Sequence, residues 1–370
     1  ALVQYEKCCQ VLAEEFSVEP AVETSALYEQ IRDGNLSAGA FEPASLPQGT
    51  LAPLHSLPVQ TTPMIGRVVE LAELDRLLCD PGVRLVTITG PGGIGKTRLA
   101  TAITHQMAEA GCFRDGVIFV PLTPITTRSL LVTTIAEQLD LALSGNRQPE
   151  RTLLGFLRGR DCLIVLDNFE HLLPDVGFIA RLLEVAPRAK LLVTSRERLT
   201  LQEEWLLDLE GLPYPSTVQE AQSSDYDAVN LFSQRASQIR SSFSLEENLA
   251  AVVRICQLTQ GMPLALEQAA GLIRVCHAGE IADLIEGGLE SLSTTLRNLP
   301  ERHRSMRAVF DGSWRWLSEE ERKVLCRLSV FQGSFTHEAA VQVADASLSV
   351  LSTLVDKSLL HRGPGLGETT

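Results

Sequence analysis

The sequence predicts an α/β fold: a parallel sheet flanked by helices, followed by a mostly helical C-terminal part. Five short apolar runs alternate with helix-competent segments between residues 63 and 211. The runs are continuous rather than alternating in polarity, which is typical of strands buried on both faces of a parallel sheet. Beyond residue 225 the strand-like runs fade, and helical patterns dominate to about residue 330. The expected strands cover 84–89, 117–121, 162–166, 191–194 and 205–209.

The composition is that of a globular protein with an acidic balance. The 370 residues are 45% hydrophobic and 5% aromatic, and the formal net charge is −14. A protein that wraps nucleic acid needs a surplus of lysine and arginine to neutralise phosphates, so the average charge argues against that class. A local basic face stays compatible with this average, and the candidate is the cluster Arg302, His303, Arg304 and Arg307.

The cysteines and the hydropathy pattern indicate the compartment. None of the eight cysteines forms a CxxC pair, and no histidine lies at metal-ligand spacing from them. Reduced, structural thiols of this kind predict a cytoplasmic protein. No apolar run approaches the ~20 residues that a membrane helix needs, so we expect no membrane partner.

The first part of the chain predicts short helices and then a linker. Apolar residues at helical spacing indicate two amphipathic helices within 1–42. No charged residue lies between Glu42 and Arg67, and prolines at positions 43, 47, 53, 58 and 63 favour an extended linker over 43–62. The chain opens inside a helical pattern and ends in a polar tail, 364–370, so we expect it to be a piece of a longer protein.

A glycine-rich loop at Gly90–Thr97 predicts a phosphate site. It matches GxxxxGK[ST] in full and lies between a strand candidate and a helix-competent segment, 98–110. Its glycines let successive backbone N–H groups converge on phosphate oxygens, and the helix N-terminus adds its positive dipole end. We expect Lys96 to reach the β- and γ-phosphates and Thr97 to ligate Mg²⁺. The sequence therefore predicts an α/β P-loop NTPase domain that binds a purine nucleoside triphosphate.

An acidic residue after a buried strand is the candidate second metal ligand. Asp167 follows the apolar run Leu163–Leu166 and lies 71 residues after Lys96. A strand-terminal acid near a P-loop can hold the water shell of Mg²⁺. The next residue is Asn168, and an amide cannot act as a general base. Glu170 is close enough in sequence to take that role, so we expect hydrolysis to be slow or to need a partner.

A basic residue after another buried strand is the candidate phosphate sensor. Arg196 follows the run ending at Thr194, and ligands of open parallel sheets bind outside the carboxyl ends of the strands. An arginine there can contact the γ-phosphate. Arg198 competes for this role, and an ordinary surface arginine is the structural alternative.

These motifs together resemble the NB-ARC-type P-loop ATPases of the STAND class, and most closely those of bacterial transcriptional regulators of the SARP/AfsR kind. The similarity extends over nearly all of residues 1–363. The motifs that carry it are the entry motif Met64-Ile65-Gly66-Arg67 with Glu70, the Walker A and B segments Gly90–Thr97 and Leu163–Asp167, the sensor Thr194-Ser195-Arg196, and Gly261–Leu266, which is similar to "GLPLAL".

The resemblance implies an adenine nucleotide, ATP or ADP, as the ligand. It implies catalytic roles for Lys96, Asp167 and Arg196, and Mg²⁺ at Thr97 and Asp167. The backbone of the entry motif is expected to contact adenine, and Pro263 to pack near the nucleotide. The expected nucleotide-contacting residues are Ile65, Gly66, Arg67, Gly90, Gly92, Gly93, Ile94, Gly95, Lys96, Thr97, Arg98 and Pro263.

The resemblance also implies a division of the chain. The expected nucleotide-binding domain spans 63–211, a helical domain spans 212–296, and a winged-helix domain spans 297–363. Residues 1–42 resemble the last helices of a bacterial transcriptional activator domain of TPR-like type. Proteins of this family contact DNA through a domain that precedes this segment, and inducers through helical repeats that follow the winged helix.

The function that this combination predicts is an ATP/ADP-governed switch with slow ATPase activity, which self-associates in the ATP state. Exchange or hydrolysis of the nucleotide would rearrange the domains. Three alternatives stay open at this point: a turnover hydrolase or kinase, a scaffold that holds ADP permanently, and a direct DNA reader formed by 297–362. A clear activated base is missing from the sequence motifs, which favours the switch over the turnover enzyme.

Overall fold

The computed structural model describes residues 54–59, 62–143, 148–288, 305–331, 333–361 and 368–369. The chain divides into two compact units, Ala1–Ala52 and Pro53–Thr370, and every described residue belongs to the second. The helices predicted within 1–42, the greater part of the predicted linker and three members of the basic cluster, Arg302, His303 and Arg304, lie outside the described residues.

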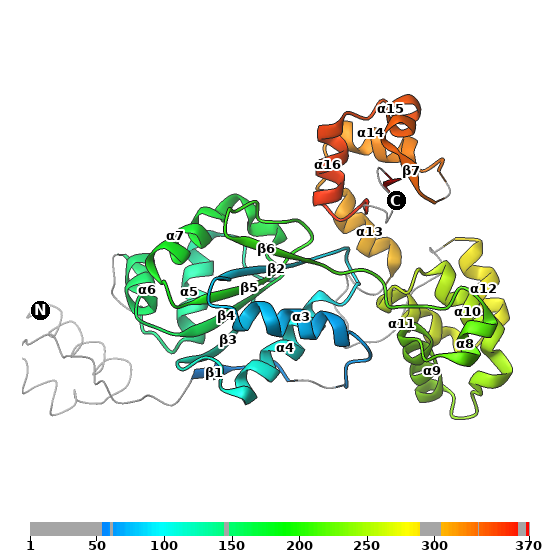
Figure 1. Cartoon of the computed structure of the whole chain (residues 1–370), viewed down its shortest axis with the longest axis horizontal. Helices are drawn as coiled ribbons and strands as arrows, with labels where there is room; N and C mark the ends of the chain where they lie inside the picture. The colour runs from blue at the N-terminus through cyan, green and yellow to red at the C-terminus, as the bar shows by residue number, and fades with distance from the viewer. Residues whose placement is uncertain are drawn as a thin grey trace, which may run out of the picture. The chain divides into compact units, whose positions relative to one another are not determined.

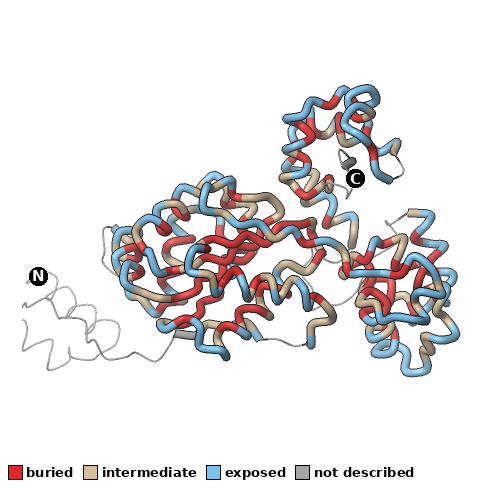
Figure 2. The backbone as a smooth tube through the Cα atoms, in the orientation of Figure 1, coloured by how far each residue is buried: buried red, intermediate tan, exposed pale blue. Residues whose placement is uncertain are grey.

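A parallel sheet forms the centre of the second unit (Figure 1). Its six strands follow the order β1-β3-β4-β5-β2-β6, and every neighbouring pair is parallel. The five predicted strands are confirmed, with ends shifted by at most one residue. Figure 2 shows the inner strands as buried along their length. The strands are β1 (Leu54–Ser56), β2 (Leu85–Thr89), β3 (Gly116–Pro121), β4 (Cys162–Asp167), β5 (Lys190–Thr194) and β6 (Glu204–Asp208).

Strand β1 differs from the expectation for the proline-rich segment. Residues 43–62 were expected to be an extended linker, but Leu54–Ser56 pairs with the start of β3, Leu54 opposite Gly116. Prolines at 53 and 58 flank the strand, and proline is tolerated beside an edge strand because only one side of that strand donates hydrogen bonds to the sheet. The chain therefore joins the sheet edge before it reaches the entry motif.

Helices cover both faces of the sheet, because alternate strand residues point to opposite faces. Leu85 of β2 packs with α5, α6 and α7, whereas its neighbour Val86 packs with α3 and α4. A sheet covered on both faces explains why the strands read as continuous apolar runs. The helices are α3 (Val68–Cys79), α4 (Lys96–Ala110), α5 (Arg128–Gln138), α6 (Pro149–Leu157) and α7 (Gly177–Val185); the 3₁₀ helix η2 (Glu170–Asp175) precedes α7.

The helices that follow the sheet have a core of their own. Phe232, Ile255 and Leu266 are fully buried in it, each from a different helix. Thr217 and Ser244 cap α8 and α10 by accepting hydrogen bonds from backbone N–H groups three residues on, as expected for N-cap residues. The elements are α8 (Val218–Ser223), α9 (Asp227–Ile239), α10 (Leu245–Leu258), α11 (Pro263–Gly271), η3 (Leu272–Arg274) and α12 (Ala278–Glu286).

Two glycines let the backbone that leaves the sheet cross the turn before α11. A Cβ on Gly211 would lie 2.0 Å from the Gln260 carbonyl oxygen, and one on Gly261 would lie 2.0 Å from the Leu212 carbonyl oxygen. Gly261 also has a φ of +65°, and its carbonyl accepts a hydrogen bond from the Leu212 N–H at 2.8 Å. Glycine is needed here both for the left-handed backbone and for the close approach.

We expect Gly261→Ala to lower the free energy of unfolding by about 3 kcal/mol or more, since it adds backbone strain to a backbone clash. Gly271, in the last position of α11, is the matched control because its Cβ would meet nothing within 4 Å. Gly271→Ala should be neutral or stabilising by up to about 1 kcal/mol. Urea unfolding followed by circular dichroism measures both. If the two variants had equal urea midpoints, the close approach to Leu212 could not be the reason that residue 261 is a glycine.

The C-terminal described residues form four helices and a two-stranded antiparallel sheet. Leu317, Leu328 and Leu354 are among their buried core residues. The winged-helix assignment of 297–363 stays a prediction. The elements are α13 (Met306–Trp314), α14 (Glu319–Leu328), β7 (Phe335–Thr336), α15 (His337–Ala344), α16 (Leu348–Asp356) and β8 (Glu368–Thr369).

In the described part of the chain no single helix is long and apolar enough to span a membrane. Helices α15 and α16 meet the length and hydropathy criterion only as a pair, and that pair is bent by 106°.

Candidate functional site

The glycine-rich loop connects the carboxyl end of β2 to the first turn of α4. Gly93 and Gly95 have φ angles of +82° and +103°, a conformation that glycine adopts readily. Gly95 is the N-cap residue of α4, and no described side chain caps that end of the helix. A Cβ on Gly95 would meet nothing within 4 Å, so space lies open beside the loop. Uncapped N–H groups facing open space at a helix N-terminus fit an anionic group.

Lys96 is folded over this loop. Its Nζ donates to the carbonyl oxygens of Gly90 at 2.6 Å and Pro91 at 3.1 Å. The ammonium group therefore lies beside the space that the loop encloses. A lysine in this place can transfer its hydrogen bonds from carbonyl oxygens to phosphate oxygens without leaving the site.

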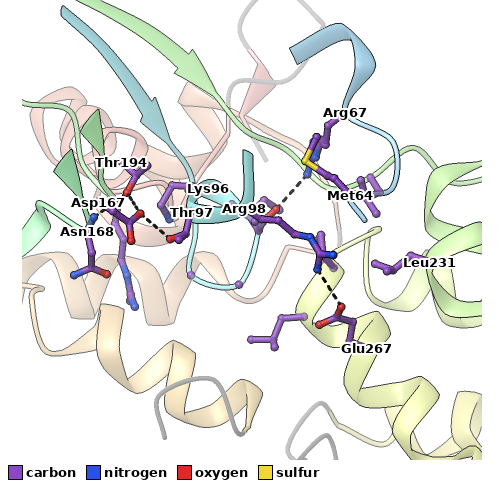
Figure 3. Close-up of a pocket in the computed structure, with 18 of the residues that line it drawn as sticks. Met64, Arg67, Lys96, Thr97, Arg98, Asp167, Asn168, Thr194, Leu231 and Glu267 are labelled. Atoms are coloured by element: carbon purple, nitrogen blue, oxygen red, sulfur yellow. Dashed lines mark hydrogen bonds and ion pairs between the residues drawn. The ribbon is translucent and has the colours of Figure 1, made fainter. Parts of the chain in front are cut away.

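Asp167, at the end of β4, is bonded to two threonine hydroxyls (Figure 3). Its Oδ1 accepts from Thr97 Oγ1 at 2.8 Å and from Thr194 Oγ1 at 2.7 Å. Burial raises the pKa of the Asp167 carboxyl, and the hydrogen bonds from Thr194 and Thr97 oppose that shift without cancelling it. A buried carboxylate with a raised pKa gains when a cation is placed beside it.

The donor set fits Mg²⁺ that arrives with a nucleotide. Thr97 and Asp167 bring a hydroxyl and a carboxylate oxygen together, and hard oxygen ligands are those that Mg²⁺ takes. Among the described residues, no group of three or more His, Cys, Asp or Glu side chains could hold a metal by itself. Mg²⁺ is commonly held by one or two protein oxygens together with substrate phosphates, and this pair could supply the protein part.

Arg196 faces the site, whereas Arg198 does not line it. Arg196 Nε lies 3.2 Å from Glu170 Oε1, and its Nη1 donates to Ser313 Oγ of α13 at 2.7 Å. Arg198 Nε instead lies 3.1 Å from Asp356 Oδ1 at the end of α16. Of the two candidate sensors, Arg196 is therefore the one that lines the cavity.

The three residues after Asp167 make different contacts. Asn168 has a φ of +71°, its N–H donates to Thr194 Oγ1 at 2.8 Å, and its amide lies 3.4 Å from His171 Nδ1. Phe169 is fully buried, and its N–H donates to the Thr194 carbonyl at 2.9 Å. The chain then turns so that Glu170 lines the same cavity as Asp167. The sequence left the direction of Glu170 open, and the structure determines it.

A cavity of about 410 Å³ brings most of the predicted residues together. Gly66 and Gly90 are predicted contacts that are not part of its lining. Gly66 lies against Asp227, where its missing Cβ would be 2.1 Å from Oδ2, and Gly90 lies against the Leu209 carbonyl. The predicted residues that line the cavity are Ile65, Arg67, Gly92, Gly93, Ile94, Gly95, Lys96, Thr97, Arg98, Asp167, Arg196 and Pro263.

The end of the cavity opposite Asp167 is apolar with a charged rim (Figure 3). Met64, Leu212 and Leu231 join Ile65 and Pro263 there. Leu212 and Leu231 were not predicted, because each reads only as a core residue with no motif around it. An apolar compartment of this kind accommodates a flat, largely apolar ring system.

Two arginines at this end are held by the protein itself. Arg67 is buried, and its guanidinium donates to the carbonyls of Glu210 at 2.6 Å and Ile94 at 3.3 Å, so its side chain ties the entry motif to the loop. Arg98 Nη1 lies 3.7 Å from an oxygen of Glu267 on α11, and burial lowers the pKa of the Arg98 guanidinium. Glu267 was not predicted, since no local pattern links it to the P-loop.

Helices α11 and α13 both contact the loop. The Leu264 N–H of α11 donates to the Gly93 carbonyl at 3.2 Å. A Cβ on Gly92 would lie 2.6 Å from Val309 Cγ1, so α13 packs directly on the loop. Gly92 and Val309, which are more than 200 positions apart in the sequence, are therefore in contact at the glycine-rich loop.

This fold and this loop define a P-loop nucleotide-binding protein, and comparisons with known proteins give its family. The NB-ARC domain model matches residues 67–202. A Mycobacterium tuberculosis protein named as an HTH-type transcriptional regulator is 37% identical over 297 residues, which cover 77% of this chain and 32% of that protein. An uncharacterized protein of the same species is 32% identical over 330 residues, covering 86% of this chain and 80% of that protein.

Two further matches extend the comparison. The regulatory protein AfsR of Streptomyces griseus is 29% identical over 380 residues, covering 98% of this chain and 37% of AfsR. The solved structure of a STAND protein with a tetratricopeptide repeat sensor from Pyrococcus horikoshii aligns with 82% of this chain at 20% identity and a TM-score of 0.38. The chain belongs to the same family as the second Mycobacterium protein, contains an NB-ARC domain at residues 67–202, and is similar to AfsR-type bacterial regulators. Its P-loop domain is of a nucleotide-binding family, and the chain spans about a third of the length of the first relatives it matches.

Proposed function

We propose that this chain is a switch whose state is set by ATP or ADP bound with Mg²⁺ in the cavity between the P-loop and α11. Lys96 and the loop N–H groups would hold the phosphates, Thr97 and Asp167 would hold Mg²⁺, and the apolar end would hold adenine. Mg²⁺ bound there would neutralise phosphate charge during hydrolysis.

The observation that carries the proposal is the position of Arg196. One guanidinium lines the phosphate end of the cavity and at the same time binds Ser313 on α13. A γ-phosphate near Arg196 would compete with Ser313 and Glu170 for its donors, whereas a diphosphate would leave these contacts in place. Nucleotide state would thereby change how firmly α13 packs on the loop, which is the differential contact that a switch requires.

The wider role follows from the relatives and is part of the same proposal. The Mycobacterium relative is named as a transcriptional regulator of HTH type. We infer that the switch controls DNA binding by segments outside this chain, in the cytoplasm. The triphosphate state would favour self-association, and an inducer would act through segments beyond residue 370.

The experiment that tests the binding claim is the identification of nucleotide released when purified chain is denatured, together with titration of Mg-ATP and Mg-ADP. We expect about one adenine nucleotide per chain, micromolar or tighter binding, and turnover far below one per second. A chain that releases no nucleotide and binds neither would contradict the proposal. Rapid steady-state turnover would point instead to a metabolic P-loop enzyme.

A further inference from the structure

Glu170 is the acid in the cavity with a carboxylate oxygen that is buried and has no hydrogen-bond partner among the described residues. Three carboxylates line the cavity: those of Asp167, Glu170 and Glu267. Asp167 accepts from both threonine hydroxyls on Oδ1, and Glu267 pairs through Oε1 with Arg98 and, at 2.9 Å, with Arg235. The second oxygen of neither acid is buried without a partner. Glu170 uses Oε1 for Arg196, while its Oε2 is buried and has no hydrogen-bond partner among the described residues. Burying a carboxylate oxygen without a hydrogen bond costs free energy of folding, and a role in function is one reason for a protein to retain such a group.

The backbone explains how Glu170 comes to line the cavity beside Asp167 and Asn168. Asn168 is in the left-handed region and is bonded to Thr194 through its N–H. Phe169 is anchored in the core, so the next residue, Glu170, opens η2 on the cavity side. The spacing of three residues thus places a second carboxylate beside the Lys96–Asp167 end, where Asn168 offers only an amide.

We propose that Glu170 is the general base for ATP hydrolysis, an inference that rests on the proposed function. Its carboxylate takes one proton from a water molecule while the water oxygen bonds to the γ-phosphorus and the bond from that phosphorus to the bridging oxygen breaks. ADP and inorganic phosphate leave, and the proton passes from Glu170 to phosphate or solvent. Base catalysis by a placed side chain is worth about 10²–10⁴-fold in rate.

The same contacts explain how the base is held inactive. Arg196 lies on Glu170 Oε1 at 3.2 Å and is fixed by Ser313 of α13 at 2.7 Å. While this ion pair is in place, Arg196 occupies Oε1 and stands between that oxygen and the rest of the cavity. Arg196 has to move from Glu170 to the γ-phosphate before the base is released, so hydrolysis is slow while α13 is packed on the loop.

The test compares Glu170→Gln with the wild-type chain. Glutamine keeps the size of the side chain but cannot take the proton. Asp175→Asn, at the other end of η2 and outside the cavity lining, is the matched control because it removes the same charge. We expect single-turnover hydrolysis to fall about 100-fold or more in Glu170→Gln and to change less than threefold in Asp175→Asn.

A second measurement does not depend on the rate. Glu170→Gln should be purified with ATP bound where the wild-type chain carries ADP, and its affinity for Mg-ADP should stay within about threefold, which shows that the site is folded. Hydrolysis and bound nucleotide equal to those of wild type would overturn the role of Glu170. A wild-type chain that binds nucleotide but hydrolyses none in hours would overturn this role and leave nucleotide binding intact, whereas a wild-type chain that binds none would overturn both.

Discussion

Replacing Lys96 with alanine is expected to leave the purified chain empty of nucleotide. The ammonium group donates to two carbonyls of the P-loop and lies beside the space for the phosphates. A charged donor to a phosphate is worth about 1.5–3 kcal/mol, and truncation also removes the positive charge that balances two phosphate groups. We therefore expect the dissociation constant for Mg-ATP to rise about 100-fold or more.

The measurement is equilibrium titration with a fluorescent ATP analogue, with Lys323→Ala as control. Lys323 is an exposed lysine of α14, and losing it changes the net charge by the same amount. The control should bind as wild type does. If Lys96→Ala retained bound nucleotide at wild-type affinity, the phosphate site would have to lie elsewhere than on this loop.

Replacing Asp167 with asparagine is expected to have two opposite effects. The carboxylate is buried, and its burial raises the pKa of Asp167, so its charge is a cost to the chain without a cation. Asparagine keeps an oxygen that accepts from Thr97 and Thr194 while it removes the charge. The nucleotide-free chain should therefore melt a few degrees higher than wild type.

Mg²⁺-dependent function should be lost in the same variant. An amide oxygen is a weaker Mg²⁺ ligand than a carboxylate, so we expect hydrolysis to fall about 100-fold or more. Thermal unfolding of nucleotide-free protein and single-turnover hydrolysis at several Mg²⁺ concentrations measure the two effects. A variant that melts lower and hydrolyses normally would show that Asp167 is a structural residue and no metal ligand.

The parts of the site that the sequence could predict are those in which neighbouring residues carry the chemistry. The loop from Gly90 to Thr97 and the acid Asp167 belong to continuous motifs, and the cavity brings Lys96, Thr97 and Asp167 together. The strands were predictable for a similar reason, since burial on both faces makes each one a continuous apolar run. Strand β1 was missed because three residues between prolines give no such run.

The parts that the sequence could not predict depend on how distant elements meet. Leu231 belongs to the apolar face of α9, and its sequence pattern would be the same if that face met only core. Arg196 and Arg198 are two residues apart, and the course of the loop after β5 decides that one lines the cavity and the other pairs with Asp356. The direction of Glu170 depends on Phe169 being anchored in the core. Tertiary packing settles each of these cases, and local pattern does not.

In the proposed switch, the nucleotide state controls the packing of α13 on the P-loop. Hydrogen exchange of the backbone amides in Met306–Trp314 tests it most directly, with the chain saturated either with Mg-ADP or with a non-hydrolysable Mg-ATP analogue. We expect slow exchange with Mg-ADP and exchange at least about tenfold faster with the ATP analogue, because Arg196 would leave Ser313 for the γ-phosphate. Equal protection in the two states, with both nucleotides shown to be bound, would contradict it.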